Sequence, residues 1–185
     1  LLSVCKKKPI SLEVFGDTEK DMLSQAFIIN SWGKNVYVKI PVINSKGLFC
    51  GRVINKLSNQ NIKLNITAVY SSDQVKKILQ CINKKSKTII SIFAGRMGDV
   101  GKDPIPVIKK SVRLTKRFKN VKILWASTRE PYNYLQAKSF GCAIITMPPS
   151  IIEKVSKFGK TYQELTLDTV RKFLKDSVDS KFKIT

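Results

Sequence analysis

The chain of 185 residues is long enough for one domain with a sizeable core, and it contains no histidine. This composition excludes a histidine general base, a Ser-His-Asp triad and the commonest metal ligand, and we expect neither a metal site nor a cofactor. The formal net charge of +21 suggests nucleic acid or anionic substrates as partners, but the basic residues are scattered without a nucleic-acid motif, so no nucleic-acid partner is expected.

The predicted elements alternate between strands and helices along the chain. In chain order we expect a strand over 11–15, a helix over 18–32, a strand over 36–41, a helix over 46–57, a strand over 62–70, a helix over 73–83, a strand over 88–94, a helix over 104–118, a strand over 121–127, a helix over 131–140, a strand over 142–147, a short helix capped by Ser150 and a helix over 165–178. The glycine-rich segment 95–101 lacks the ending of a nucleotide-binding loop and is expected to be a loop of another kind. Such alternation predicts parallel strands joined by helical crossovers.

Alternate residues of a strand face opposite sides of a sheet, and the two sides of these six strands differ in character. One side is apolar and consists of Leu12, Val14, Val36, Val38, Ile40, Leu64, Ile66, Ala68, Ile90, Ile92, Ala94, Leu124, Ala126, Ala143, Ile145 and Met147. The other side carries Glu13, Lys39, Asn65, Thr67, Ser91, Phe93, Ser127, Arg129 and Thr146. A constant step of 26 residues separates Glu13, Lys39, Asn65 and Ser91.

This difference between the two sides favours a barrel over an open sheet. A parallel sheet covered by helices on both sides is apolar on both sides. A (β/α)8 barrel instead points one side of every strand inward and builds its site from polar groups near the carboxyl ends of the strands. The pattern therefore predicts an α/β fold of the TIM-barrel family, present in part, as a single domain over 1–185.

Lys39 interrupts a strand that is otherwise apolar or aromatic. Removing a lysine from water disfavours its ammonium form, and the neutral amine is the form that attacks carbonyls and forms Schiff bases. The alternative is a lysine at a strand end that reaches solvent. The polar residues on the neighbouring strands favour the catalytic interpretation, because a buried polar group without a partner costs about 1 to 3 kcal/mol.

Five motifs carry a resemblance to a known family: Ser-Leu-Glu-Val-Phe, Val-Lys-Ile-Pro, Leu-Asn-Ile-Thr-Ala-Val-Tyr-Ser, Ser-Ile-Phe-Ala-Gly-Arg-Met and Trp-Ala-Ser-Thr-Arg-Glu. In order and spacing they resemble the third to seventh strands of transaldolases, from about Ser11 to the C-terminus. The resemblance implies a barrel enzyme of the pentose phosphate pathway that transfers a dihydroxyacetone unit through a Schiff base. The donor would be a ketose phosphate, sedoheptulose 7-phosphate or fructose 6-phosphate, and the acceptor an aldose phosphate. It also implies that strands three to eight are present and that the first two βα units are missing from this chain.

The resemblance assigns roles to individual residues. Lys39 matches the nucleophile, and Glu13 with Thr67 matches the pair that positions the catalytic water. Hydroxyl groups of the bound three-carbon unit would be held by an amide and a hydroxyl, and the phosphate by guanidinium groups and a hydroxyl. The residues predicted to bind substrate are Asn65, Ser91, Phe93, Arg96, Ser127 and Arg129.

Two other functions remain open at this stage. One is a fructose 6-phosphate aldolase that needs no acceptor sugar, but such relatives typically carry glutamine in place of Glu13 and tyrosine in place of Phe93. The other is a homologue without catalytic activity that binds sugar phosphates or nucleic acid. Lys39 and Glu13 argue against it, whereas the missing strands and the high positive charge argue for it.

Cysteine usage and hydropathy indicate a cytoplasmic protein. The four cysteines are far apart, as is typical of reduced thiols. No apolar run approaches the roughly 18 residues of a membrane span, and no signal peptide precedes the first strand. We expect sugar-phosphate substrates, no membrane partner, and a chain that is compatible with a homo-oligomer.

Overall fold

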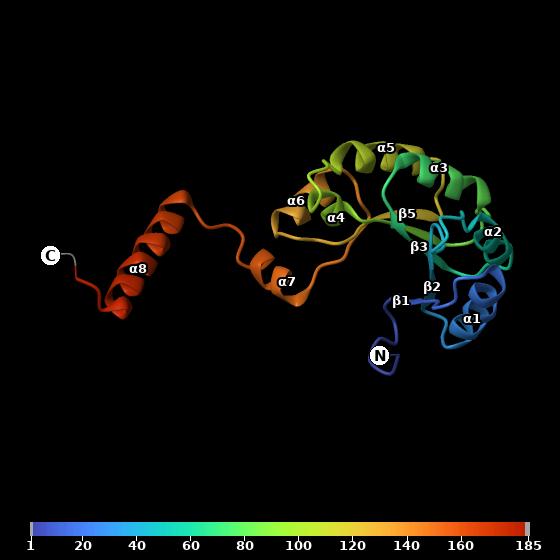
Figure 1. Ribbon diagram of the computed structural model, residues 1–185, viewed down its shortest axis with the longest axis horizontal. Coiled ribbons are helices and arrows are strands. Elements are labelled where there is room, and N and C mark those ends of the chain that lie inside the picture. The colour runs from blue at the N-terminus through green and yellow to red at the C-terminus, as the bar shows by residue number, and fades with distance from the viewer. Residues whose placement is uncertain (1, 184–185) are drawn as a thin grey trace.

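The computed structural model describes residues 2–183 and contains one parallel sheet with helices packed against it (Figure 1). The strands lie in the order β1 (Ile10–Glu13), β2 (Val36–Pro41), β3 (Leu64–Val69), β4 (Thr88–Ile92), β5 (Val121–Trp125) and β6 (Ile144–Ile145). The helices are α1 (Glu19–Ser31), α2 (Gly51–Asn59), α3 (Ser72–Cys81), α4 (Ala94–Gly98), α5 (Ile105–Thr115), α6 (Tyr132–Ser139), α7 (Pro149–Val155) and α8 (Tyr162–Ser180). The predicted alternation of parallel strands and helices is confirmed.

The sheet curves into a half-barrel. Each strand pairs in parallel with the next one along the chain. Helices α1, α2, α3 and α5 follow one another around the convex side of the sheet (Figure 1). An α/β fold with six parallel strands in a half-barrel is consistent with part of a TIM barrel, so the predicted fold class is confirmed to that extent.

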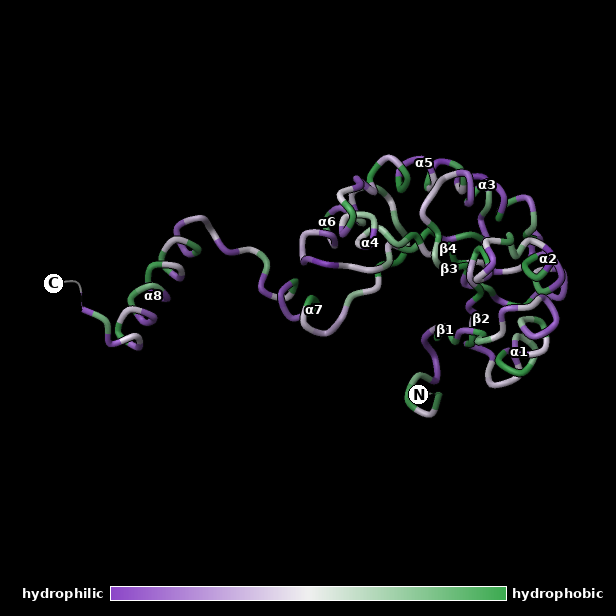
Figure 2. The backbone as a smooth tube through the Cα atoms, in the orientation of Figure 1, coloured by the Kyte–Doolittle hydropathy of each residue, from purple (hydrophilic) through white to green (hydrophobic). Residues whose placement is uncertain are grey.

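The hydrophobic core lies between the convex side of the sheet and the helices. The strands supply fully buried side chains, namely Val38, Ile40, Leu64, Ile66, Ile90 and Ile92. The helices supply buried residues at helical spacing, such as Met22, Ala26 and Ile29 of α1. Figure 2 shows the same pattern, with hydrophobic residues along the strands and alternating hydrophilic and hydrophobic residues along the helices. Burial of one such aliphatic side chain contributes about 1.5 to 3 kcal/mol.

The predicted orientation of β5 is wrong. Leu124 and Ala126 are expected to face the helices. The register instead places Leu124 beside Ser91 on the concave side, and there Leu124 and Ala126 pack with Ile89. Trp125, which is 1% exposed, faces the helices instead. The side formed by Val121, Ile123 and Trp125 is wholly apolar, whereas the other side carries Lys122. The prediction fails because it continues the alternation through Ser127, where the chain turns. Burial of the large indole ring in the core favours the observed orientation.

Two residues with positive φ reorient the chain near the carboxyl ends of the strands. Ala68 has a φ of 57° at an irregularity in the pairing of β3 with β4, so Val69 and not Ala68 takes the buried position beside Ile92. Ser127 has a φ of 65° directly after β5. Residues other than glycine rarely adopt this region, which costs about 1 to 2 kcal/mol, and the hydropathy pattern contains no sign of either.

Several element boundaries also differ from the prediction. Residues 94–98, which overlap the expected glycine-rich loop, form the short helix α4. Helix α2 begins at Gly51, because a local bridge between Ile43 and Phe49 occupies the preceding segment. Helix α7 begins after Pro148 without a side-chain cap, so the expected cap at Ser150 is wrong.

Helix α8 lies apart from the body of the molecule (Figure 1). It begins at a capping box formed by Thr161 and Glu164. Its expected apolar side, Leu167, Val170, Phe173 and Leu174, is between 46% and 66% exposed. Within residues 2–183, no helix combines the length and hydropathy of a membrane span.

Candidate active site

The concave side of the half-barrel holds a cavity of about 840 Å³. Seven of the residues predicted to form the site line it: Lys39, Asn65, Thr67, Ser91, Phe93, Arg96 and Ser127. They come from β2, β3 and β4, from α4, and from the segments that follow β4 and β5. The parallel arrangement brings together residues that are up to 88 positions apart in the chain, because neighbouring strands end at the same edge of the sheet.

Glu13 lies next to this cavity and pairs with Lys39. The register places the two residues side by side on β1 and β2, and Lys39 Nζ lies 3.1 Å from Glu13 Oε2. The Lys39 side chain is 28% exposed and that of Glu13 is 42% exposed, so the burial expected for Lys39 is partial. A pair this accessible contributes at most about 1 kcal/mol to stability. The contact also gives the amine an adjacent proton acceptor.

A chain of hydrogen bonds fixes the amide of Asn65. Ser91 Oγ donates to Asn65 Oδ1 at 2.7 Å, and Asn65 Nδ2 donates to Ser11 Oγ at 2.9 Å. Asn65 and Ser91 are buried, which makes these bonds expensive to lose. Ser11 was missed by the sequence prediction, although it lies on the same side of its strand as Glu13 and could have been found from that alternation.

Thr67 presents a hydroxyl group without a protein partner. The residue is 2% exposed and lines the cavity, and its Oγ1 has no hydrogen-bond partner among the described residues. A buried hydroxyl of this kind carries a penalty of about 1 to 3 kcal/mol. It is therefore available to bind a polar group inside the cavity.

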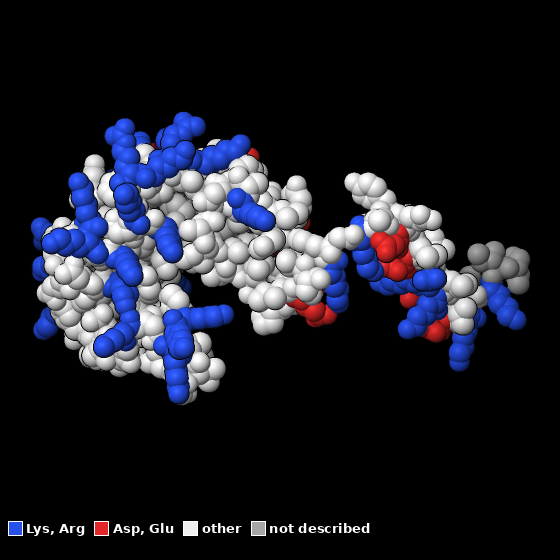
Figure 3. Space-filling model, turned by 180° about the vertical axis from the view of Figure 1, so that it is seen from behind, with Lys and Arg blue, Asp and Glu red and all other residues white. Residues whose placement is uncertain are grey.

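The cavity is strongly cationic. Its lining includes Lys8, Lys39, Arg96 and Lys122, whereas no carboxylate belongs to the lining in the described part of the chain. The Arg96 guanidinium lies over the Phe93 ring at 5.2 Å, and that ring in turn meets Tyr70 edge to face at 5.8 Å. On the face seen in Figure 3, the remaining lysines and arginines are spread over the body of the molecule. A cavity with this charge suits an anionic ligand.

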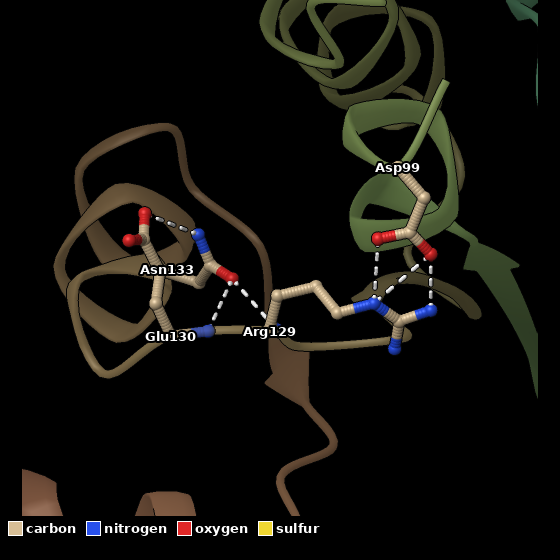
Figure 4. A network of polar contacts seen from close by, with 4 residues as sticks. All are labelled: Asp99, Arg129, Glu130 and Asn133. Atoms are coloured by element: carbon tan, nitrogen blue, oxygen red, sulfur yellow. Dashed lines mark hydrogen bonds and ion pairs between the residues drawn. The ribbon is translucent and has the colours of Figure 1, made fainter. Parts of the chain in front are cut away.

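Arg129, like Glu13, is a predicted site residue that does not line the cavity. Its Nε donates to Asp99 Oδ1 and Oδ2 at 2.8 and 3.0 Å, and its Nη2 donates to Asp99 Oδ2 at 2.5 Å (Figure 4). These hydrogen bonds lower the pKa of Asp99 and raise that of Arg129 from their ordinary values. Arg129 lines a second cavity of about 280 Å³, together with Gly95 and Asn133.

Known proteins are similar to this chain in sequence, and a solved structure is similar to it in fold. Residues 1–184 match the family described as Transaldolase/Fructose-6-phosphate aldolase. A probable transaldolase of Caldicellulosiruptor saccharolyticus is 32% identical over 91% of this chain and 72% of its own length. A probable transaldolase of Thermoplasma volcanium is 34% identical over 94% of this chain and 74% of its own length.

A solved structure of a GMP reductase from Trypanosoma brucei resembles the fold, with a TM-score of 0.53 and 11% identity, over 75% of this chain and 30% of that one. At this identity the likeness concerns the fold alone. The family match covers almost the whole chain and agrees with the resemblance seen in the five sequence motifs. The chain therefore belongs to the transaldolase/fructose-6-phosphate aldolase family.

Proposed function

We propose that this protein is a transaldolase that transfers a dihydroxyacetone unit through a Schiff base on Lys39. The donor is a ketose phosphate, sedoheptulose 7-phosphate or fructose 6-phosphate, and the acceptor is an aldose phosphate. The observation that carries the proposal is the contact of 3.1 Å between Lys39 Nζ and Glu13 Oε2 at the edge of a cationic cavity. A family that contains transaldolases supports this chemistry.

In the proposed reaction, Glu13 handles the protons while Lys39 forms the covalent bond. The ammonium of Lys39 loses a proton to Glu13, and the neutral amine attacks the ketose carbonyl to give a carbinolamine. The carbinolamine releases water, with a proton returned to its hydroxyl, and an imine remains. The C4 hydroxyl then gives its proton to Glu13 and the C3–C4 bond breaks, with the protonated imine at C2 as the electron acceptor. This releases an aldose phosphate and leaves a three-carbon enamine. The enamine adds to the acceptor aldehyde, and hydrolysis of the new imine frees the product and Lys39.

The other residues would hold the substrate during these steps. Thr67, whose hydroxyl has no protein partner among the described residues, would hold the water that exchanges protons with Glu13. Asn65 and Ser91 would bind hydroxyl groups of the three-carbon unit, because their own hydrogen bonds fix their orientation. The phosphate would bind Arg96 and Ser127 at the cavity wall, with Arg129 nearby.

The proposal includes the architecture of the whole enzyme. We place β1 to β6 as strands three to eight of a (β/α)8 barrel, with residues 1–185 as part of that single domain. The two relatives described above are longer than the matched region, since the chain spans 72% and 74% of them. Four free cysteines among the described residues agree with a cytoplasmic enzyme.

Borohydride trapping tests the proposed function. Full-length protein treated with borohydride and fructose 6-phosphate should carry a reduced adduct on Lys39, located by peptide mapping. Lys122→Arg is the matched control, since Lys122 lines the same cavity and its replacement should leave the adduct in place. An adduct on any other lysine, or none, refutes the mechanism.

The same preparation separates transaldolase from aldolase. Release of the aldose phosphate from the donor should be fast only when an acceptor aldose phosphate is present. Equal rates of release with and without the acceptor would identify the protein as a fructose 6-phosphate aldolase.

A further inference from the structure

Helix α4 touches the segment that follows β5 with no space between them. The Gly95 amide lies 3.4 Å from the carbonyl oxygen of Ala126. A Cβ atom placed on Gly95 would lie 1.5 Å from the Ser127 carbonyl oxygen and 3.0 Å from Arg129 Cγ. Glycine is therefore required here, and the stem of Arg129 lies against the first turn of the helix.

Asp99 caps the C-terminus of the same helix, one turn after Gly95. Residues four positions apart share one face of a helix, so Asp99 follows Gly95 along the side that Arg129 covers. The Arg129 guanidinium makes its hydrogen bonds with Asp99 there. At the other end of the residue, the Arg129 amide donates to Asn133 Oδ1 at 3.1 Å. Both the main chain and the head group of Arg129 are thus fixed (Figure 4).

Asp99 also lies close to the arginine that lines the main cavity. Arg96 and Asp99 line a common surface cavity of about 490 Å³. The pKa of Asp99 is lowered mainly by its hydrogen bonds with Arg129, and the charge of Arg96 lowers it further. The Asp99 carboxylate therefore binds Arg129 directly and is also within reach of the charge of Arg96.

The pair with Asp99 leaves part of the Arg129 guanidinium unused. A guanidinium group carries five N–H donors. Asp99 accepts hydrogen bonds from Nε and from Nη2, whereas Nη1 makes no hydrogen bond with the residues that the structure describes. The outer edge formed by Nη1 and Nη2 can still bind two oxygens of one phosphate, as arginine does in bidentate phosphate recognition.

We propose that Asp99 is a positioning residue for phosphate binding: it holds one edge of Arg129 so that the outer edge, together with Arg96 and Ser127, is preorganised for the substrate phosphate. This inference rests on the proposed function only in naming that phosphate as part of a sugar phosphate. Asp99 itself does not touch the substrate. Without it, Arg129 would sample several rotamers, and the entropy lost on ordering the side chain would weaken phosphate binding.

Calorimetry with inorganic phosphate as the probe tests this inference without turnover. In full-length protein, Asp99→Ala and Arg129→Ala should each weaken phosphate binding by about tenfold, as expected for one charge-assisted contact. Asp99→Glu should restore part of the affinity because it keeps a carboxylate. Asp73→Ala is the matched control, because it removes a carboxylate from another ion pair, with Lys76 on α3. The affinity of this control should not change.

The double variant separates positioning from a general effect on stability. If Asp99 acts through Arg129, then Asp99→Ala should cause no further loss of phosphate affinity in the Arg129→Ala background. Unchanged or tighter phosphate binding by Asp99→Ala, or additive losses in the double variant, overturns the inference. The proposed phosphate contacts do not involve Lys39, so the result is independent of borohydride trapping. A missing adduct on Lys39 refutes the proposed function and leaves the test of Asp99 unaffected.

Discussion

Replacement of Gly95 by alanine should damage both the fold and the phosphate region. The added Cβ would lie 1.5 Å from the Ser127 carbonyl oxygen and 2.7 Å from its carbonyl carbon. Both neighbours are main-chain atoms, so the clash is relieved only if α4 and the segment after β5 move apart by roughly 2 Å, in an interior that packs as densely as a crystal. We expect the free energy of unfolding to fall by about 3 kcal/mol or more, at the upper end of the range for overpacked interiors.

Gly98 provides the matched control on the same helix. A Cβ atom at Gly98 would meet no atom within 4 Å. Gly98→Ala should therefore be neutral or stabilise the protein by up to about 1 kcal/mol, the ordinary gain for alanine in a helix. Urea denaturation of the full-length variants, followed by far-ultraviolet circular dichroism, measures both changes. If Gly95→Ala unfolds at the same urea concentration as Gly98→Ala, the described contact between α4 and Ser127 is wrong.

Three further predictions concern the site and the thiols. Glu13→Gln should lower kcat by about 10² to 10⁴-fold and stability by at most about 1 kcal/mol, because the lost ion pair is accessible; a variant that turns over normally excludes Glu13 as the proton carrier. Arg96→Ala should raise KM for fructose 6-phosphate by about tenfold, while adduct formation with unphosphorylated dihydroxyacetone stays the same, and equal losses on both would show a structural role. Burial raises the pKa of Cys142 to about 12 and that of Cys50 to about 11, so both should react slowly with iodoacetamide at pH 8 and about tenfold faster per added pH unit; rapid labelling of folded protein at pH 8 would contradict the burial of Cys50 and the partial burial of Cys142.

The sequence predicts the fold where one pattern has one solution. In β2, β3 and β4 only one side is apolar enough for the core, and the orientation of Lys39, Asn65 and Ser91 follows from that. In β5 the side that faces the helices is also the more apolar one, since the other side carries Lys122, but the predicted orientation is continued through Ser127 and is therefore reversed. Hydropathy contains no sign of the turn at Ser127, because a positive φ breaks the alternation without a change of residue type.

The sequence predicts the cavity better than its surroundings. Most of the predicted residues line this cavity. They could be predicted because the alternation along each strand and the constant step between strands are visible directly in the sequence. The link between Arg129 and Asp99 joins a loop to a helix 30 positions away, in a segment expected to be a loop. Ser127 faces the cavity after a residue-specific backbone turn, with a φ of 65°, that no periodicity reveals.

The in-register pairing of the first three strands determines which residues lie beside Lys39. Glu13, Lys39 and Asn65 are direct neighbours across the sheet. Adjacent strands are about 4.8 Å apart, so the Cα atoms of these three residues span roughly 10 Å, with Lys39 in the middle. Under the proposed function, a three-carbon fragment attached to the Lys39 amine would lie beside both neighbours. On the same proposal, recognition of the rest of a longer sugar would fall to the later strands and α4, and the site would hold the transferred unit while one acceptor replaces another.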